Sequence, residues 1–178
     1  MTSYKEELTR AMTYLGSKND SIFIGQAVSV EGTGMSKTLI NVSPSKLIEF
    51  PVEEEFQLGV SIGMSLNGLK PICIYPRWNF LLLAVNQLVN HLDKIKDLNA
   101  SNGSNQLIIR TAVGSESPMH PGTQHVGDFT DSFRLLCRNI SIHRLENKNE
   151  IFEIYKNAFE RKDGVSSLII EISDKYYT

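Results

Sequence analysis

Short apolar segments alternate along this sequence with longer segments in which apolar residues recur every three or four positions. Segments of the first kind have the length and β-branched content of buried strands, and the others have the period of amphipathic helices. We expect strands at 21–25, 47–50, 70–75, 106–111, 141–145 and 166–173. We expect helices at 79–97, 129–137 and 149–162, and an N-terminal helix that begins at the capping-box pair Ser3 and Glu6. This alternation predicts an α/β fold with three layers, in which a doubly wound, mostly parallel sheet of about six strands has helices on both faces.

Length and charge limit the function classes. A chain of 178 residues with 41% hydrophobic content can bury one core, so we expect a single domain over residues 1–178. A net charge of −2 provides neither a basic stripe for nucleic acid nor a polybasic patch for a membrane surface. The apolar runs, such as that at 81–85, are too short to span a bilayer, and the charged N-terminus is unlike a signal peptide. We therefore expect a soluble cytoplasmic protein with no nucleic-acid or membrane partner.

The cysteines and histidines do not form a metal-binding pattern. Cys73 and Cys137 are far apart with no CxxC pairing, and we expect both to be small buried apolar residues. His120 and His125 are five residues apart, and no neighbouring cysteine or carboxylate completes a ligand set. The sequence therefore predicts no metal site on this chain.

The segment FPVEEEFQLGVSIGMSLNG at 50–68 gives conflicting signals. Apolar residues alternate with polar or small ones over 56–67, which by period alone indicates a strand. That length is unusual for a strand, and Gly59 and Gly63, four residues apart, favour a helix packed closely against its neighbours. A connection between two parallel strands also requires a crossover. We expect a helix, with the three glutamates at 53–55 in its first turn, where the backbone's partial positive charge favours anions.

On these residues alone, a solvated helix start is a sufficient explanation of the three glutamates. Six segments, taken in order, carry a resemblance to a known family: IFIGQAV at 22–28, PVEEEFQLGVSIG at 51–63, GLKPICIYPRWNF at 68–80, AVNQLVNHLDK at 84–94, LIIRT at 107–111 and GTQH at 122–125. Through them the chain, from Ser21 to about Ile142, resembles the pyrimidine-binding domain of transketolase-like thiamine diphosphate enzymes. The resemblance is closest to the beta subunit of pyruvate and branched-chain 2-oxo acid dehydrogenases.

The resemblance implies a catalytic role for one glutamate. The family's cofactor-activating acid falls on Glu54, in the PxxE pattern that starts at Pro51. In the family this carboxyl group hydrogen-bonds a nitrogen of the aminopyrimidine ring and promotes an imino form, which takes the proton from the thiazolium carbon. Such a group must be shielded from water while it holds or shares a proton, and the apolar run after Glu54 provides that setting.

The same resemblance implies four further site residues. Phe80 matches the aromatic residue that stacks on the pyrimidine ring, and Val52 would be an aliphatic wall of that pocket. Pro76 stands beside the cofactor, where a methionine is usual. His125 matches the active-site histidine, which donates to the substrate or intermediate as charge develops on oxygen. Without the resemblance, Phe80 is an ordinary core residue and His125 an ordinary solvated loop residue.

The chain also departs from the family pattern. Gln26 replaces an acidic residue after the first glycine of the region, and Leu83 and Asn86 replace residues that are often acidic or polar on a proton route between paired active sites. The departures at Leu83 and Asn86 favour a relative that has lost communication between sites by that route, and the three departures together favour one that has lost turnover.

The resemblance also implies a cofactor and a partner. The cofactor is thiamine diphosphate with Mg²⁺, but the family's GDG motif followed by an asparagine is absent, since GDF at 127–129 and DGV at 163–165 do not match it. We expect a separate diphosphate-binding alpha-type subunit to hold most of the Mg²⁺ site, in an α2β2 heterotetramer. We expect an apolar partner-facing surface that includes Trp78 and the leucines at 81–83.

Three functions remain open from the sequence. The first is a beta-type subunit of a split enzyme that decarboxylates a 2-oxo acid or transfers an acyl or two-carbon unit. The second is a transketolase-like ketol transferase subunit acting on sugars, and the third is a noncatalytic regulatory or binding relative. The residues do not distinguish a small 2-oxo acid from a ketose as substrate.

Overall fold

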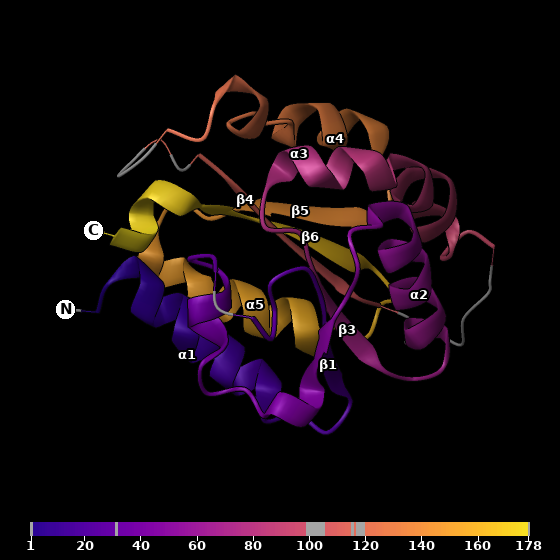
Figure 1. Ribbon diagram of the computed structural model, residues 1–178. Coiled ribbons are helices and arrows are strands. Elements are labelled where there is room, and N and C mark those ends of the chain that lie inside the picture. Colours follow the sequence, from indigo (N-terminus) through magenta and orange to yellow (C-terminus); the bar gives the residue numbers. More distant parts are fainter. Residues whose placement is uncertain (1, 31, 99–105, 115, 117–119, 178) are drawn as a thin grey trace.

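The computed structural model describes residues 2–30, 32–98, 106–114, 116 and 120–177, and its centre is a six-stranded sheet (Figure 1). The strands are β1 (Ser21–Gly25), β2 (Leu47–Glu49), β3 (Lys70–Ile74), β4 (Ile108–Val113), β5 (Ile140–Arg144) and β6 (Ser166–Ile172). They lie side by side in the order β2-β1-β3-β4-β6-β5, and every neighbouring pair is parallel. The predicted fold class is confirmed.

Helices cover both faces of the sheet. One face is covered by α1 (Tyr4–Gly16) and α5 (Ile151–Glu160), and the other by α2 (Glu54–Leu66), α3 (Trp78–Leu81) and α4 (Thr130–Leu136) (Figure 1). Each face has its own apolar core, one around α1 and α5 and one around the three other helices. Burial of apolar side chains on both faces is the main favourable contribution to folding of such a layered domain.

The start of the chain folds as its local sequence predicts. The Ser3 side chain accepts a hydrogen bond from the Glu6 amide, and the Glu6 carboxylate accepts one from the Ser3 amide. This capping box satisfies two N–H groups that the first turn of α1 cannot pair itself. Leu8 and Met12, on one side of the helix, are fully buried against the sheet.

The direction in which the chain winds reverses at β1. From β1 the chain passes to β2 through η1 (Ser36–Leu39) and η2 (Pro44–Lys46), on the face that holds α1. It then returns through α2, on the opposite face, to β3, which pairs with the other side of β1. The loops that follow β1 and β3 therefore diverge at the carboxyl end of the sheet. In open α/β sheets, ligands bind in the crevice that such a reversal creates.

The segment with conflicting signals is a helix, α2, as predicted. Its buried residues are spaced three or four apart, which is the period of a helix face and not of a strand: Glu54, Gln57, Leu58, Ser61, Ile62 and Ser65. The small side chains Ser61 and Ser65 let the helix approach the sheet closely, and both donate to carbonyls of the preceding turn. The residues that produce the apparent alternation include Phe56 and Leu66, which are exposed.

The helical segment predicted at 79–97 begins one residue earlier and is irregular. After the single turn of α3 come a 3-10 turn η3 (Leu82–Ala84), a π-helical turn η4 (Gln87–His91) and a 3-10 turn η5 (Leu92–Lys94). The apolar residues Leu88 and Leu92 nevertheless face the core. The predicted period is therefore confirmed, whereas regular α-helical hydrogen bonding is not.

Two further expectations can be compared with the structure. Cys73 and Cys137 are both free and buried, as predicted. Among the helices in the described ranges, none combines the length and hydrophobicity that crossing a membrane requires.

The remaining 3-10 turns are η6 (Thr123–His125), η7 (Lys148–Glu150) and η8 (Ser173–Tyr177).

Candidate functional site

The three consecutive glutamates have three different environments. Glu53 is exposed at the N-cap position of α2, and Glu55, half-buried, accepts a hydrogen bond of 2.9 Å from the Asn86 amide. Glu54 is only 5% exposed although it lies in the first turn. A carboxylate there is favoured by the helix dipole, which partly offsets the cost of removing it from water.

The Glu54 carboxylate has one recorded partner. Gln26, directly after β1, donates from Nε2 to Glu54 Oε1 over 3.1 Å, and the Tyr75 hydroxyl donates to the Glu54 main-chain carbonyl over 2.9 Å. Glu54 Oε2 has no hydrogen bond from the described residues. Its two lone pairs leave it the capacity to accept a hydrogen bond from a ligand.

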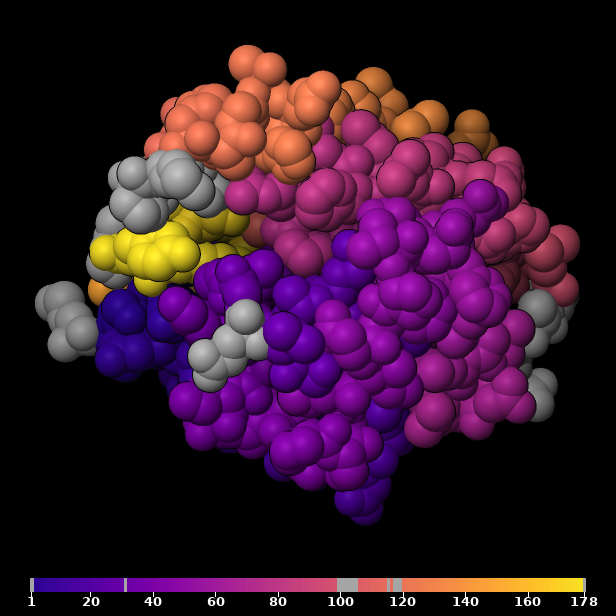
Figure 2. All heavy atoms as spheres, in the orientation of Figure 1, coloured from indigo at the N-terminus to yellow at the C-terminus, as the bar shows by residue number. Residues whose placement is uncertain are grey.

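Phe80 and His125 meet at the same end of the sheet. Their ring centroids are 5.7 Å apart and the rings are nearly perpendicular, at 81°. Phe80 follows β3, on α3, whereas His125 comes from η6 in the connection after β4. In Figure 2 the orange segment that carries η6 lies above the magenta segment that carries α3.

His125 has an unsatisfied nitrogen. Its Nδ1 is buried and has no hydrogen-bond partner among the described residues. The main-chain carbonyl of His125 accepts a hydrogen bond from Arg77, at 3.4 Å, and Arg77 also reaches the carbonyl of Gly114 at the end of β4. A buried nitrogen without a partner is costly, and this one faces no ligand-accessible surface in the described part of the structure.

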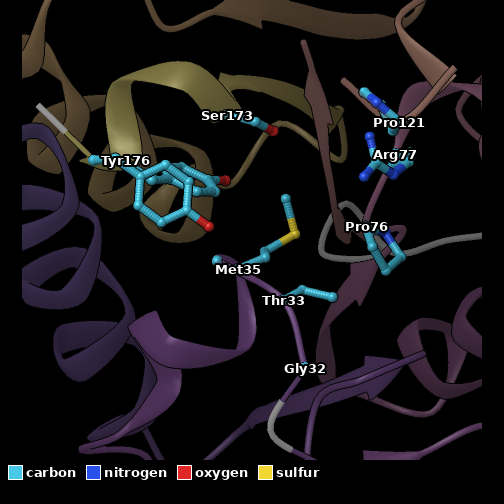
Figure 3. A pocket seen from close by; sticks show the side chains of 10 residues that line it. Gly32, Thr33, Met35, Pro76, Arg77, Pro121, Ser173 and Tyr176 are labelled. Atoms are coloured by element: carbon cyan, nitrogen blue, oxygen red, sulfur yellow. The ribbon is translucent and has the colours of Figure 1, made fainter. Parts of the chain in front are cut away.

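The other two predicted site residues lie apart from this group. Pro76 lines a cavity at the carboxyl end of the sheet, next to Arg77 and Met35 (Figure 3). Val52 is 78% exposed, so within this chain it is not the wall of an enclosed pocket. A wall at Val52 would need to be completed by a ligand or another chain.

The predicted partner-facing surface needs a correction. Trp78 and Leu81 are fully buried, because Trp78 packs against Phe133 with ring centroids 4.8 Å apart and donates through its indole N–H to Asp128. These two residues are part of the core and cannot meet a partner. The next two leucines are exposed, Leu82 by 37% and Leu83 by 63%.

Sequence reasoning missed two contacts at the site. The Gln26–Glu54 hydrogen bond joins residues 28 positions apart, and Gln26 was noted only as a departure from the family pattern. No feature of the sequence drew attention to Arg77, whose contacts with two loops depend on the fold. Among the described residues, no group of three or more His, Cys, Asp or Glu side chains lies close enough together to hold a metal ion.

Two kinds of curated protein are similar to this chain, although no family model matches it. The 1-deoxy-D-xylulose-5-phosphate synthase of Fusobacterium nucleatum is 26% identical over 162 residues, which are 88% of this chain and 25% of that protein. The mitochondrial pyruvate dehydrogenase E1 component subunit beta of Saccharomyces cerevisiae is 28% identical over 130 residues, 71% of this chain and 35% of that protein. The chain thus spans about a quarter to a third of the length of these relatives.

One solved structure supports the same fold. A split gene transketolase, described as an inactive beta4 tetramer, superposes with a TM-score of 0.63 at 18% identity, over 96% of this chain and 51% of the other. Together with the two curated relatives, it confirms the transketolase-like resemblance that the sequence predicts.

Proposed function

We propose that residues 1–178 form a single pyrimidine-binding domain that acts as the beta-type subunit of a split thiamine diphosphate-dependent enzyme. The reaction is decarboxylation of a 2-oxo acid or transfer of an acyl or two-carbon unit. One observation carries the proposal: the only one of the three glutamates that is buried, Glu54, is the one that the family resemblance selects. Its carboxylate lies at the end of the sheet where Phe80 and His125 also meet.

The residues present fit the aminopyrimidine end of this cofactor. Glu54 Oε2 has no hydrogen bond from the described residues, and Phe80 offers a half-buried aromatic ring. These two residues offer one acceptor or proton carrier and one stacking surface to a flat heterocycle. When bound, thiamine diphosphate supplies a nucleophilic carbon and a place for the electron pair released from the substrate.

Each residue has a defined role in this proposal. Glu54 holds and returns a proton at Oε2, while Gln26 fixes Oε1 by its 3.1 Å hydrogen bond and so orients the carboxylate. Phe80 positions the ring, with Val52 and Pro76 as further contacts. His125 donates a hydrogen bond or a proton where negative charge develops on the substrate oxygen.

The diphosphate and Mg²⁺ belong to an alpha-type partner in this proposal. The sequence lacks the GDG motif with its asparagine, and exposed apolar side chains on α2 and beyond α3, such as Phe56 and Leu83, offer a surface for another subunit. The arrangement that we propose is an α2β2 heterotetramer. The word "subunit" in the name of the yeast relative and the words "split gene" in that of the structural neighbour support a divided enzyme.

A ketol transferase acting on sugars is the second candidate. It is favoured by the names of two relatives, the deoxyxylulose phosphate synthase and the split transketolase. A noncatalytic relative is favoured only by the departures at Gln26, Leu83 and Asn86.

The test is turnover by the assembled enzyme. The chain is combined with the product of a neighbouring alpha-like gene, thiamine diphosphate and Mg²⁺, and is assayed with small 2-oxo acids and with ketose phosphates. Glu54→Gln should lower kcat by about 10²–10⁴-fold, the usual contribution of a proton-transfer group. Glu53→Gln, which changes the exposed neighbour, is the matched control and should be close to wild type. An active assembly in which Glu54→Gln has no effect would refute the proposed role.

A further inference from the structure

A cavity at the carboxyl end of the sheet has one charged side chain, Arg77, among the described residues that line it. Its volume is about 260 Å³, and its walls come from the loop after β1, from the residues after β3, from Pro121 and from η8 after β6. In Figure 3, Met35 lies between the tyrosine rings of η8 on one side and Pro76 and Arg77 on the other. Figure 2 shows the yellow C-terminal turn against the N-terminal segments, below the orange segment that carries η6.

Arg77 is the one ionised side chain among the described residues that line this cavity, the others being apolar, glycine, hydroxyl or phenol groups. Its recorded hydrogen bonds are two contacts of 3.4 Å from one terminal nitrogen, to the carbonyls of Gly114 and His125. These distances are long for N–H···O bonds. A guanidinium has five N–H donors, so most of its hydrogen-bonding capacity is not used by the described part of the chain.

The described part of the chain also gives Arg77 no ion-pair partner. Within the described ranges, no carboxylate lies within 4.0 Å of its guanidinium. The carboxylate of Asp174 lies beside Gly114, where a Cβ atom would come within 2.8 Å of its Oδ2, and Asp174 is not among the described residues that line the cavity. The buried ion pair behind Tyr176, between Arg110 and Glu171, is neutral as a unit. A half-buried cation in a mostly apolar hollow attracts anions more strongly than an exposed one.

The cavity adjoins the proposed reaction site through Arg77 itself. Arg77 is three residues before Phe80, and its guanidinium contacts the main chain of His125. A ligand group bound by Arg77 would therefore lie next to the loop that carries His125.

We propose that this cavity is the subsite for the anionic group of a small substrate, a carboxylate or a phosphate. The anion accepts two parallel N–H···O bonds from Arg77, the geometry that guanidinium groups favour, and the Ser173 hydroxyl is a further donor. The volume is below that of typical drug-sized sites, which limits the ligand to a few heavy atoms and excludes a nucleotide. This inference rests on the proposed function for its substrate class, since both a 2-oxo acid and a triose phosphate carry such a group.

The test is an NMR titration of the full 178-residue chain, which at 20.0 kDa is accessible to this method. The probes are pyruvate, inorganic phosphate and, as an uncharged analogue, methyl pyruvate. We expect saturable shifts of the Met35 methyl group and of the amides of Gly34 and Ser173 with pyruvate, with phosphate, or with both. Methyl pyruvate should give none. Saturation by one anion alone identifies which chemical group the subsite accepts.

Variants make the assignment specific. Arg77→Gln should weaken anion binding by at least about tenfold, which corresponds to ~1.4 kcal/mol, and Arg77→Lys should restore part of it. Arg138→Gln removes the same charge at an exposed position outside the cavity and should change affinity by no more than about twofold. Wild-type affinity in Arg77→Gln, or shifts confined to residues outside the cavity, would overturn the proposal. Circular dichroism establishes whether each variant is folded. If Arg77→Gln does not fold, Arg77→Lys still tests the proposal, because it keeps the positive charge but cannot donate two parallel hydrogen bonds.

The titration uses neither cofactor nor partner, so its result is independent of the turnover assay. If turnover depends on Glu54 but the chain does not bind anions at Arg77, only the proposed subsite is refuted. If the chain binds anions at Arg77 but Glu54→Gln does not change the turnover of the assembled enzyme, only the proposed function is refuted.

Discussion

Replacing both members of the buried Arg110–Glu171 ion pair should destabilise the fold much less than the two single replacements added together. Both side chains are fully buried, and Arg110 donates to the two carboxylate oxygens over 2.6 and 3.0 Å. The hydroxyls of Tyr155 and Tyr176 also donate to Glu171. Arg110→Met leaves the carboxylate buried with only those two donors, which should cost about 3–5 kcal/mol. Glu171→Leu leaves the guanidinium unpaired and should cost a similar amount.

The double variant removes both charges together. Its remaining cost is the loss of an acceptor for the two tyrosine hydroxyls, at about 1–3 kcal/mol for each buried unsatisfied group, offset by apolar packing of the new side chains. The free energy of unfolding, from urea melts followed by circular dichroism, should therefore fall in the double variant by less than the two single losses added together. The sum of the two single losses in unfolding free energy should exceed the loss in the double variant by at least about 2 kcal/mol. Additive effects would show that the two charges are not coupled and would contradict the geometry.

Two other predictions follow from burial. Burial and the neighbouring Glu171 carboxylate raise the pKa of Tyr155 and of Tyr176 well above the ordinary value near 10. Because the unfolded chain loses these protons at lower pH than the folded chain, the free energy of unfolding should fall as the pH rises above about 10. The fall should be shallower in Tyr155→Phe and Tyr176→Phe. Urea melts at pH 8 to 11 in which unfolding free energy falls equally steeply in the wild type and both variants would contradict this. Burial also raises the pKa of the Cys73 thiol, and burial with the Asp93 charge raises that of Cys137 to about 12. A chromogenic disulfide reagent at pH 8 should thus react rapidly with neither thiol until the chain is unfolded, and fast labelling of the folded chain would refute this.

The elements that the sequence predicts well are those whose determinants are local. The capping box of Ser3 and Glu6 gives the observed start of α1, and the short apolar segment at 21–25 gives β1 with its observed bounds, because caps and strand periods are set by neighbouring residues. The segment 50–68 was harder, since two periods fit it. The length of the segment, the spacing of Gly59 and Gly63 and the need for a crossover between parallel strands favour the helix, and the burial of small serines against the sheet explains why that choice is right.

The site was predictable only in part. The resemblance selected Glu54 among three neighbours, but its hydrogen bond to Gln26 links two elements that the sequence alone does not bring together. Trp78 was expected on the surface and is in the core, because its burial depends on the position of Phe133, from a distant helix. Arg77 is a single charged residue after a strand, and its importance depends on a cavity that four separate loops create.

The central claim concerns proton transfer at Glu54, and hydrogen–deuterium exchange at the thiazolium carbon of the bound cofactor tests it most directly. In the complex with the alpha-type partner, Glu54→Gln should slow this exchange by about 10²–10⁴-fold, while Glu53→Gln should leave it near the wild-type rate. Exchange at the wild-type rate in Glu54→Gln would contradict the account, whatever the effect of that substitution on turnover.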